Sequence, residues 1–220
     1  MKKISDKGFK VGVIDSGKGG QLVGQRIKDK FPEVEIVQYI PEIFTSYSNM
    51  SVENLFILSK THVDYLVEQK VDLIVIGCMT LSTNCLNFIK KISPVRVLDV
   101  YTNLGYLDKS FTVIATENSI RSGKFTQCVE IPCGHLSGAI QNKEDLIKCG
   151  MTYSEESPSE AYEILIKKLL RGFIASSKEV ITNKIILGCT HYPLELELIK
   201  EVMGDVEYID PINKLVEKLK

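Results

Sequence analysis

The chain has 220 residues, of which 44% are hydrophobic and 25% charged. This is the composition of an ordinary globular protein, and it excludes a disordered chain or a disulfide-stapled mini-protein. The 27 Lys and Arg residues nearly balance the 28 Asp and Glu residues, so the net charge is -1. The electrostatic footprint of a protein that binds nucleic acid or an anionic membrane is therefore absent. At this length there is room for one or two domains.

The N-terminal segment has no signal-peptide core, because polar residues follow its lysines before any apolar stretch begins. No apolar window reaches the roughly 18 to 20 residues that a membrane-spanning helix needs. The six cysteines are therefore expected to be reduced thiols in the cytosol. The sequence predicts a cytoplasmic protein that binds neither nucleic acid nor a membrane, and in which any special cysteine has a chemical role.

Short apolar runs rich in Val and Ile alternate with longer segments of helical periodicity, which is the pattern of βαβ units. The runs are almost continuously apolar, as expected of parallel strands covered on both faces. Strands are predicted at 10–14, 34–39, 73–76, 95–98, 111–115, 129–132, 185–187 and 206–209. Helices are predicted at 22–30, 52–69, 82–91, 159–174 and 211–219, and a loop is predicted at 141–157. The helix at 159–174 has the clearest start, because Ser157 and Glu160 have the spacing of a capping box.

The two halves of the chain resemble each other weakly. The first strand of each half leads into a small hydroxyl residue, Ser16 in one and Thr116 in the other. A later buried strand of each half ends in Gly-Cys, at Cys78 and at Cys189. Two such matches in the same order suggest a duplicated lobe.

The predicted fold class is therefore α/β, with two pseudo-symmetric lobes that each consist of a mostly parallel sheet flanked by helices. The first lobe is expected to comprise residues 1–99 and 206–220, and the second lobe residues 100–205. In such a fold the active site is expected in the cleft between the lobes.

Cys78 and Cys189 are predicted to lie where parallel α/β sheets bind ligands, beyond the carboxyl ends of strands and at helix N-termini. A thiol in that position has a lowered pKa and a larger thiolate fraction, so both cysteines are candidate bases. The alternative is that they only pack, since free cysteine is among the most buried residue types. Their duplicated placement favours the chemical role.

His191 follows Cys189 by two residues in the segment Gly-Cys-Thr-His-Tyr-Pro. An imidazole there can exchange a proton with the thiol or with a ligand, although a histidine can equally be a packing residue. Asp15 ends the first strand and is either a helix cap or a carboxylate directed at the ligand.

The sequence does not match three other ligand-binding motifs. Residues 12–19 approach a phosphate-binding loop, but Gly19 stands where Ser or Thr would bind magnesium. The dinucleotide fingerprint lacks its third glycine, because Leu22 stands in that position. Two Cys-x-His pairs, which begin at Cys133 and Cys189, have a spacing atypical of structural zinc sites. The sequence therefore predicts neither a cofactor nor a metal ion.

Four segments together resemble the glutamate racemases of the aspartate/glutamate racemase superfamily. They are residues 14–20 (Ile-Asp-Ser-Gly-Lys-Gly-Gly), residues 77–80 (Gly-Cys-Met-Thr), Ser122 with Gly123, and above all residues 188–193. Their order and spacing hold over nearly the whole chain. The resemblance implies a two-lobed amino-acid racemase that uses no cofactor, commonly forms a homodimer and serves peptidoglycan synthesis in the cell wall.

The resemblance also assigns roles to residues of this chain. Cys78 and Cys189 match the cysteines of a two-base mechanism, in which one thiolate removes the α-proton and the opposite thiol returns a proton with inverted configuration. Asp15 and His191 match the residues that assist these proton transfers. The α-proton is very weakly acidic, so donors must stabilise a carbanion. The positions that match those holding the substrate are Ser16, Tyr47, Ser48, Thr80, Thr116, Ser119 and Thr190.

The chain departs from the family at three places. Met79 replaces an Asn that contacts the substrate, Ser46-Tyr47-Ser48 replaces a Pro-Tyr-Gly turn, and Gln141 aligns with an acidic residue that assists the second cysteine. Losing one hydrogen bond to a charged group costs roughly 1.5 to 3 kcal/mol, or about one to two orders of magnitude in affinity. Two alternatives therefore stay open: a related racemase or isomerase with a different substrate, and a ligand-binding homologue with impaired catalysis.

Overall fold

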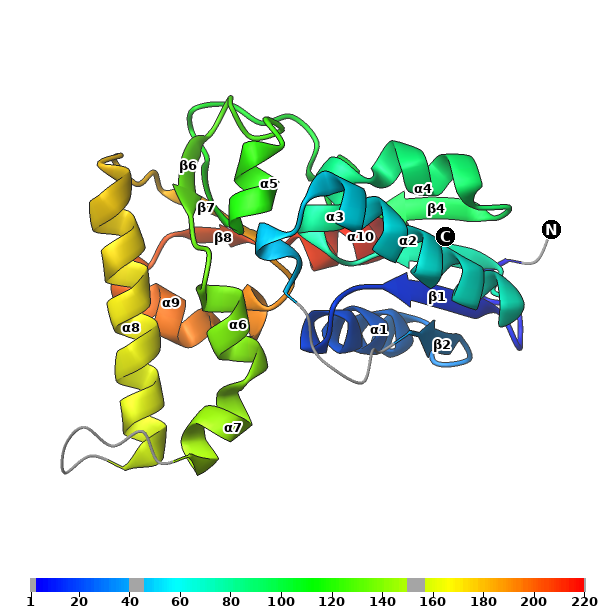
Figure 1. The fold of residues 1–220 in the computed structure, drawn as a ribbon, viewed down its shortest axis with the longest axis horizontal. Helices are drawn as coiled ribbons and strands as arrows, with labels where there is room; N and C mark the ends of the chain where they lie inside the picture. Colours follow the sequence, from blue (N-terminus) through cyan, green and yellow to red (C-terminus); the bar gives the residue numbers. More distant parts are fainter. Residues whose placement is uncertain (1–2, 40–45, 150–156, 220) are drawn as a thin grey trace. The chain divides into compact units, whose positions relative to one another are not determined.

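The computed structural model describes residues 3–39, 46–149 and 157–219. The chain divides into two compact units, Met1–Tyr106 with Asp210–Lys220, and Leu107–Ile209 (Figure 1). Each unit contains a four-stranded parallel sheet with helices packed against it. Within the described residues, no helix combines the length and the apolar character needed to cross a membrane.

The sheet of the first unit has the strand order β2-β1-β3-β4. Its strands are β1 (Lys10–Ile14), β2 (Glu35–Gln38), β3 (Leu73–Ile76) and β4 (Arg96–Asp99). β1 pairs in parallel with β2 on one side and with β3 on the other. Every residue of β3 is buried, as its unbroken Leu, Ile and Val sequence predicts for a central strand. The carboxyl ends of β1 and β3 therefore lie next to each other.

Helices pack against this sheet and complete the first unit. They are α1 (Lys18–Lys30), α2 (Val52–Glu68), α3 (Met79–Asn84), α4 (Leu86–Ile92) and α10 (Pro211–Lys218), with the 3-10 helices η1 (Tyr47–Asn49) and η2 (Thr102–Leu104). α1 and α2 both pack on β1, and α10 packs on α1. Arg26 of α1 forms an ion pair with Asp210, and Lys30 donates a 2.7 Å hydrogen bond to the carbonyl of Val216. These contacts attach the end of the chain to the first unit.

The sheet of the second unit has the strand order β6-β5-β7-β8. Its strands are β5 (Thr112–Ala115), β6 (Val129–Pro132), β7 (Lys184–Gly188) and β8 (Glu207–Ile209). Its helices are α5 (Glu117–Arg121), α6 (Leu136–Gln141), α7 (Lys143–Lys148), α8 (Pro158–Ser177) and α9 (Leu196–Met203), with the 3-10 helix η3 (Tyr192–Glu195). The predicted capping box begins α8, with Ser157 and Glu160 bonded reciprocally.

The two sheets share one strand order, since β1, β2, β3 and β4 occupy the same places in their sheet as β5, β6, β7 and β8 do in theirs. The predicted fold class, two α/β lobes with parallel sheets, is confirmed by this topology. In each unit the central pair of strands is followed by the residues that carry the predicted chemistry. Asp15 and Cys78 follow β1 and β3, and Thr116 and Cys189 follow β5 and β7.

The structure differs from the predicted elements at several places. The predicted helix at 82–91 is divided at Cys85 into α3 and α4. Side chains compete for the carbonyls of α3, because the hydroxyl of Thr83 donates to the Met79 carbonyl at 3.0 Å and the amide of Asn84 donates to the Thr80 carbonyl at 2.9 Å. The predicted loop at 141–157 contains α7 in its described part, and α5, α6 and α9 have no counterpart among the predicted helix ranges.

The strand at 206–209 is expected in the first lobe, whereas β8 pairs with β7 in the second unit, with Tyr208 opposite Ile185. The unit boundaries accordingly lie after Tyr106 and Ile209 instead of after residues 99 and 205. The sequence of a three-residue strand is too short to predict which strand it pairs with. Its sheet is therefore known only from the backbone hydrogen bonds in the structure.

Candidate active site

Two loops of the first unit bring Asp15 and Cys78 to one edge of its sheet. Asp15 follows β1 and Cys78 follows β3, and the two strands are neighbours. The backbone N–H of Cys78 donates to the carbonyl of Ile14 at 3.4 Å, which ties the two loops together. The side chain of Asp15 is fully buried and Cys78 is 7% exposed. A carboxylate and a thiol are thus held in a region with little access to solvent.

Gly77 is the residue that allows these two loops to approach. A Cβ atom at this position would lie 2.9 Å from Cγ2 of Val23 and 3.2 Å from Oδ2 of Asp15. Glycine leaves room for the Asp15 carboxylate next to the Cys78 turn. The Gly-Cys pair at the end of β3 therefore has a packing reason as well as a chemical one.

Tyr47 of η1 lies close to Asp15 and Cys78. It is 3% exposed, and its pKa is raised above the ordinary value first by burial and then by the neighbouring Cys78 and Asp15. The hydroxyl therefore keeps its proton at neutral pH and can donate a hydrogen bond. Its oxygen lies 2.9 Å from Nε2 of His62, a fully buried residue of α2. Sequence reasoning missed His62, because a lone histidine on the buried face of a helix has no pattern that separates it from a packing residue.

Ser16 and Ser48 also lie in the first unit and are buried. The backbone N–H of Ser16 donates to Oδ1 of Asp15 at 2.6 Å, which orients the carboxylate. Ser48 lies in η1, and its hydroxyl oxygen accepts a hydrogen bond from the hydroxyl of Ser46 at 3.0 Å. The Ser-Tyr-Ser turn is thus held by its own side chains where the family has Pro-Tyr-Gly.

Met79 and Thr80 begin α3, and Cys78 is the residue that precedes the helix. Both are buried. The thioether of Met79 cannot donate a hydrogen bond, so the position after the first cysteine contributes apolar surface where the resemblance leads one to expect an amide. Thr80, the second residue of α3, is the first residue of this helix with a polar side chain.

The second unit repeats the arrangement with different side chains. Thr116 follows β5 and Cys189 follows β7, and both are buried. The hydroxyl of Thr116 shares a 2.8 Å hydrogen bond with the hydroxyl of Ser119. A Cβ atom at Gly188 would lie 2.8 Å from the carbonyl oxygen of Ile114, so this position requires glycine.

Cys189 is the first of three side chains in hydrogen-bond contact. Its Sγ lies 3.7 Å from Nδ1 of His191, and Nε2 of His191 lies 2.8 Å from Oε1 of Gln141 at the end of α6. Because the amide oxygen of Gln141 only accepts, Nε2 carries the hydrogen and Nδ1 presents a lone pair to the sulfur. Cys189 is 7% and His191 2% exposed, and Thr190 between them is also buried. This geometry suits transfer of a proton between the thiol and the imidazole.

The turn that carries His191 is held by buried polar contacts on η3. The hydroxyl of Tyr192 donates to the carbonyl of Cys133 at 3.1 Å. The carboxylate of Glu195 accepts from Nζ of Lys143 at 2.7 Å and from the hydroxyl of Tyr162 at 3.1 Å. These contacts connect η3 to β6, α7 and α8, so the position of His191 is set by three other elements.

The Cys133-Gly134-His135 segment has no ligand-like geometry. Cys133 is fully buried, and its pKa is raised first by burial and then by Cys189 and Glu117. Its S–H donates to the carbonyl of Ile131 at 3.5 Å. Among the side chains that the structure describes, no three His, Cys, Asp or Glu residues gather as metal ligands do.

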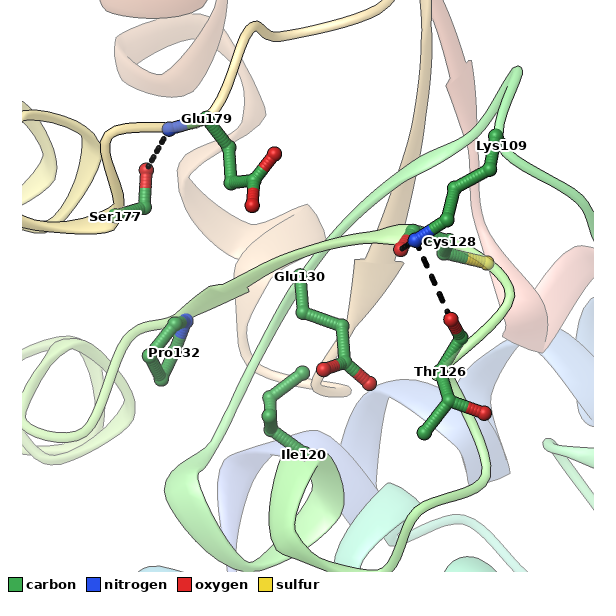
Figure 2. Close-up of a pocket in the computed structure, with 8 residues that line it drawn as sticks. All are labelled: Lys109, Ile120, Thr126, Cys128, Glu130, Pro132, Ser177 and Glu179. Carbon is green, nitrogen blue, oxygen red and sulfur yellow. Dashed lines mark hydrogen bonds between the residues drawn. The ribbon is translucent and has the colours of Figure 1, made fainter.

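A cavity of about 460 Å³ lies elsewhere in the second unit (Figure 2). Its lining residues are Lys109, Ile120, Thr126, Cys128, Glu130, Pro132, Ser177 and Glu179. None of them is a predicted site residue. Burial raises the pKa of the Cys128 thiol to about 11, so it is not a thiolate at neutral pH, and Lys109 is engaged by the carbonyls of Thr126 and Cys128 at 3.3 and 3.0 Å. We therefore take the cysteines that follow β3 and β7 as the candidate catalytic residues of their units.

No family model matches the chain. The glutamate racemase of Lactococcus lactis subsp. cremoris is 30% identical over 207 residues, which cover 91% of this chain and 74% of that protein. The glutamate racemase of Aquifex aeolicus is 29% identical over 219 residues, which cover 96% of this chain and 82% of that protein. The structure of glutamate racemase from Francisella tularensis in complex with D-glutamate has the same fold, with a TM-score of 0.79 at 23% identity, over 98% of this chain and 80% of that chain.

Proposed function

Because the chain belongs to the glutamate racemase family, we propose that it interconverts the D- and L-enantiomers of glutamate, or of a closely related acidic amino acid, without a cofactor. The observation that carries this proposal is the duplicated placement of Cys78 and Cys189. Each is buried within two residues of the end of the third strand of a parallel sheet, with Asp15 near Cys78 and His191 in contact with Cys189. The D-glutamate formed would serve peptidoglycan synthesis.

The proposed reaction uses one cysteine on each face of the α-carbon. A thiolate takes the α-proton and becomes a thiol, while the electron pair of the broken C–H bond stays on the α-carbon and is shared with the adjacent carboxylate. The other cysteine then gives its S–H proton to the opposite face, which forms the new C–H bond and leaves a thiolate. After one turnover the two sulfurs have exchanged protonation states. The reverse reaction returns each cysteine to its original protonation state.

The groups beside each cysteine supply or remove protons between turnovers. At Cys189 the lone pair on Nδ1 of His191 can accept the thiol proton, and Gln141 keeps the imidazole in that tautomer. At Cys78 the buried carboxylate of Asp15 has the corresponding place. Proton transfer by positioned groups of this kind contributes about 10² to 10⁴ in rate.

The carbanion and the substrate carboxylates need donors in a dry environment. Buried hydroxyl groups near the two cysteines would supply them. These residues are Ser16, Tyr47, Ser48, Thr80, Thr116, Ser119 and Thr190.

A second candidate is favoured by Met79. Its buried thioether directly follows Cys78 and cannot contact an ammonium or carboxylate through a hydrogen bond. A related racemase or isomerase whose substrate has an apolar group at that point would fit this residue better. Met79→Asn is therefore expected to lower the KM for glutamate by about tenfold if glutamate is the substrate, as a restored hydrogen bond to a charged group predicts.

Hydrogen exchange at the α-carbon tests both candidates. The protein is incubated in D₂O with D- and L-glutamate, with aspartate, and with 2-substituted acids that lack the amino group. We expect deuterium to enter the α-carbon of glutamate together with inversion, so that it appears first in the enantiomer that was not supplied. Exchange confined to another acid supports the second candidate. Binding of glutamate without exchange of any compound would mean that the chain is a ligand-binding homologue and would overturn both.

We also propose that the protein works in the cytoplasm as a homodimer. All six cysteines are thiols, as a reducing compartment allows, and the resemblance to dimeric racemases supports the oligomeric state. Light scattering over a range of protein concentrations tests the dimer, and a constant mass of one chain would contradict it.

A further inference from the structure

His62 and Tyr47 form a buried pair behind Cys78. Nε2 of His62 lies 2.9 Å from the hydroxyl oxygen of Tyr47, and both side chains are buried. The ring of Tyr39 packs edge-on against His62, with ring centroids 5.3 Å apart. His62 comes from the buried face of α2, whereas Tyr47 comes from η1. The contact therefore joins the turn that faces Asp15 and Cys78 to a long, well-packed helix.

The imidazole of His62 is neutral in this environment. Burial lowers its pKa to about 4, so it carries one hydrogen at neutral pH, on either Nδ1 or Nε2. Nδ1 is buried and has no hydrogen-bond partner among the described residues. If Nδ1 carried the hydrogen, a buried N–H donor would be left without an acceptor, which native proteins rarely tolerate. A hydrogen on Nε2 instead leaves only a lone pair without a partner and makes the observed contact a donation to Tyr47.

We infer that His62 donates from Nε2 to the hydroxyl oxygen of Tyr47 and so directs the hydroxyl hydrogen of Tyr47 toward the substrate on the side of Asp15 and Cys78. This inference rests on the proposed function, because it assigns Tyr47 as a donor to a substrate carboxylate. A hydroxyl whose oxygen already accepts a hydrogen bond is also a stronger donor. His62 is therefore a positioning residue that acts through Tyr47 and touches no substrate.

The tautomer of His62 tests this inference without any activity. The protein is labelled with ¹⁵N-histidine, and two-bond ¹H–¹⁵N correlations report which ring nitrogen carries the hydrogen. The signals of His62 are those that disappear in His62→Gln. We expect the hydrogen on Nε2, and a hydrogen on Nδ1 would overturn the inference. If the wild-type protein exchanges no amino acid, the proposed function fails, while this measurement still decides the tautomer.

Kinetics of matched variants test the positioning role. His62→Phe keeps an aromatic ring but no donor, and we expect it to raise the KM about tenfold with a smaller effect on kcat. His62→Gln keeps an N–H donor and is expected to recover most of this loss. In a Tyr47→Phe background, His62→Phe is expected to have no further effect, because the hydroxyl it acts through is gone.

Two outcomes would contradict the positioning role. One is an equal loss from His62→Phe with and without the Tyr47 hydroxyl. The other is a His62→Gln variant no more active than His62→Phe while both melt at the wild-type temperature. If His62→Phe does not fold, the tautomer measurement on the wild-type protein still decides whether His62 donates to Tyr47.

Discussion

The two units share a strand order but surround their cysteines with different groups. In the first unit, Cys78 lies near the carboxylate of Asp15 and the phenol of Tyr47. In the second unit, Cys189 contacts the imidazole of His191, which in turn contacts the amide of Gln141. The repeat thus preserves the scaffold that places a thiol after the third strand, while the chemistry beside each thiol has diverged. A reaction that interconverts two mirror-image substrates needs its two thiols in equivalent positions. The groups that exchange protons with each thiol need not be the same.

The largest expected effect comes from removing either thiol. Cys78→Ser and Cys189→Ser are each expected to lower racemisation about 10³-fold, because a hydroxyl is a far weaker acid than a thiol and is not ionised at neutral pH, so it can neither take nor give the proton readily. Cys149→Ser is the matched control, since Cys149 is exposed and outside both groups. Circular dichroism at a wavelength that reports the optical activity of glutamate follows the reaction. Retention of racemisation in either active-site variant would show that only one cysteine is needed.

The two Gly-Cys turns are expected to differ in how tightly they are packed. Gly188→Ala places a methyl group 2.8 Å from the Ile114 carbonyl, which is backbone, and we expect a loss of about 3 kcal/mol in unfolding free energy. Gly77→Ala meets the side chain of Val23, which can turn, and should cost about 1 kcal/mol.

Urea unfolding measures both losses. Gly172→Ala in α8 meets no atom within 4 Å and is expected to gain up to about 1 kcal/mol, as alanine does in a helix interior. Equal losses for Gly77→Ala and Gly188→Ala would contradict this difference between the two units.

His62 has no equivalent in the second unit and is expected to make stability depend on pH. Its pKa is about 4 in the folded protein and about 6.5 in the unfolded chain. Between these values the unfolded chain binds a proton that the folded protein does not, so the unfolding free energy falls as the pH is lowered from 6.5 to 4. The full loss is about 3 kcal/mol.

The His62→Gln variant isolates this contribution from the titration of carboxyl groups. The difference in unfolding free energy between wild type and variant, measured in urea at a series of pH values, is expected to shift by about 3 kcal/mol across that interval, to the disadvantage of the wild type. A difference that is constant with pH would show that His62 has the same pKa in the folded protein as in the unfolded chain.

The smallest effect is expected at Gln141. Gln141→Glu replaces an amide with a carboxylate beside Nε2 of His191, which favours the imidazolium form. The neutral imidazole then requires a higher pH, so the acid limb of the kcat/KM profile is expected to move upward by about one pH unit. Gln127→Glu adds the same charge to an exposed position of the second unit and is expected to leave the profile unchanged. No shift in Gln141→Glu would show that His191 does not act as the base for Cys189.

Much of the fold could be predicted because it depends on local patterns. Apolar runs of three to six residues predicted the strands of both sheets, and a capping box predicted the start of α8. The division of a helix at Cys85 could not be predicted, because competing side-chain hydrogen bonds decide it. The same holds for β8, since only pairing with β7 shows which sheet it joins.

The candidate site divides in the same way. The order of residues along the chain determined that Cys78 and Cys189 follow buried strands and that His191 accompanies the second cysteine, since a parallel sheet presents such positions at its carboxyl edge. The resemblance places Gln141 at the second cysteine, but only the tertiary structure decided that its amide meets His191 and that His62 meets Tyr47. These partners are separated by 50 and 15 residues, and a hydrogen bond between distant segments depends on how helices pack, which no local pattern of residues encodes.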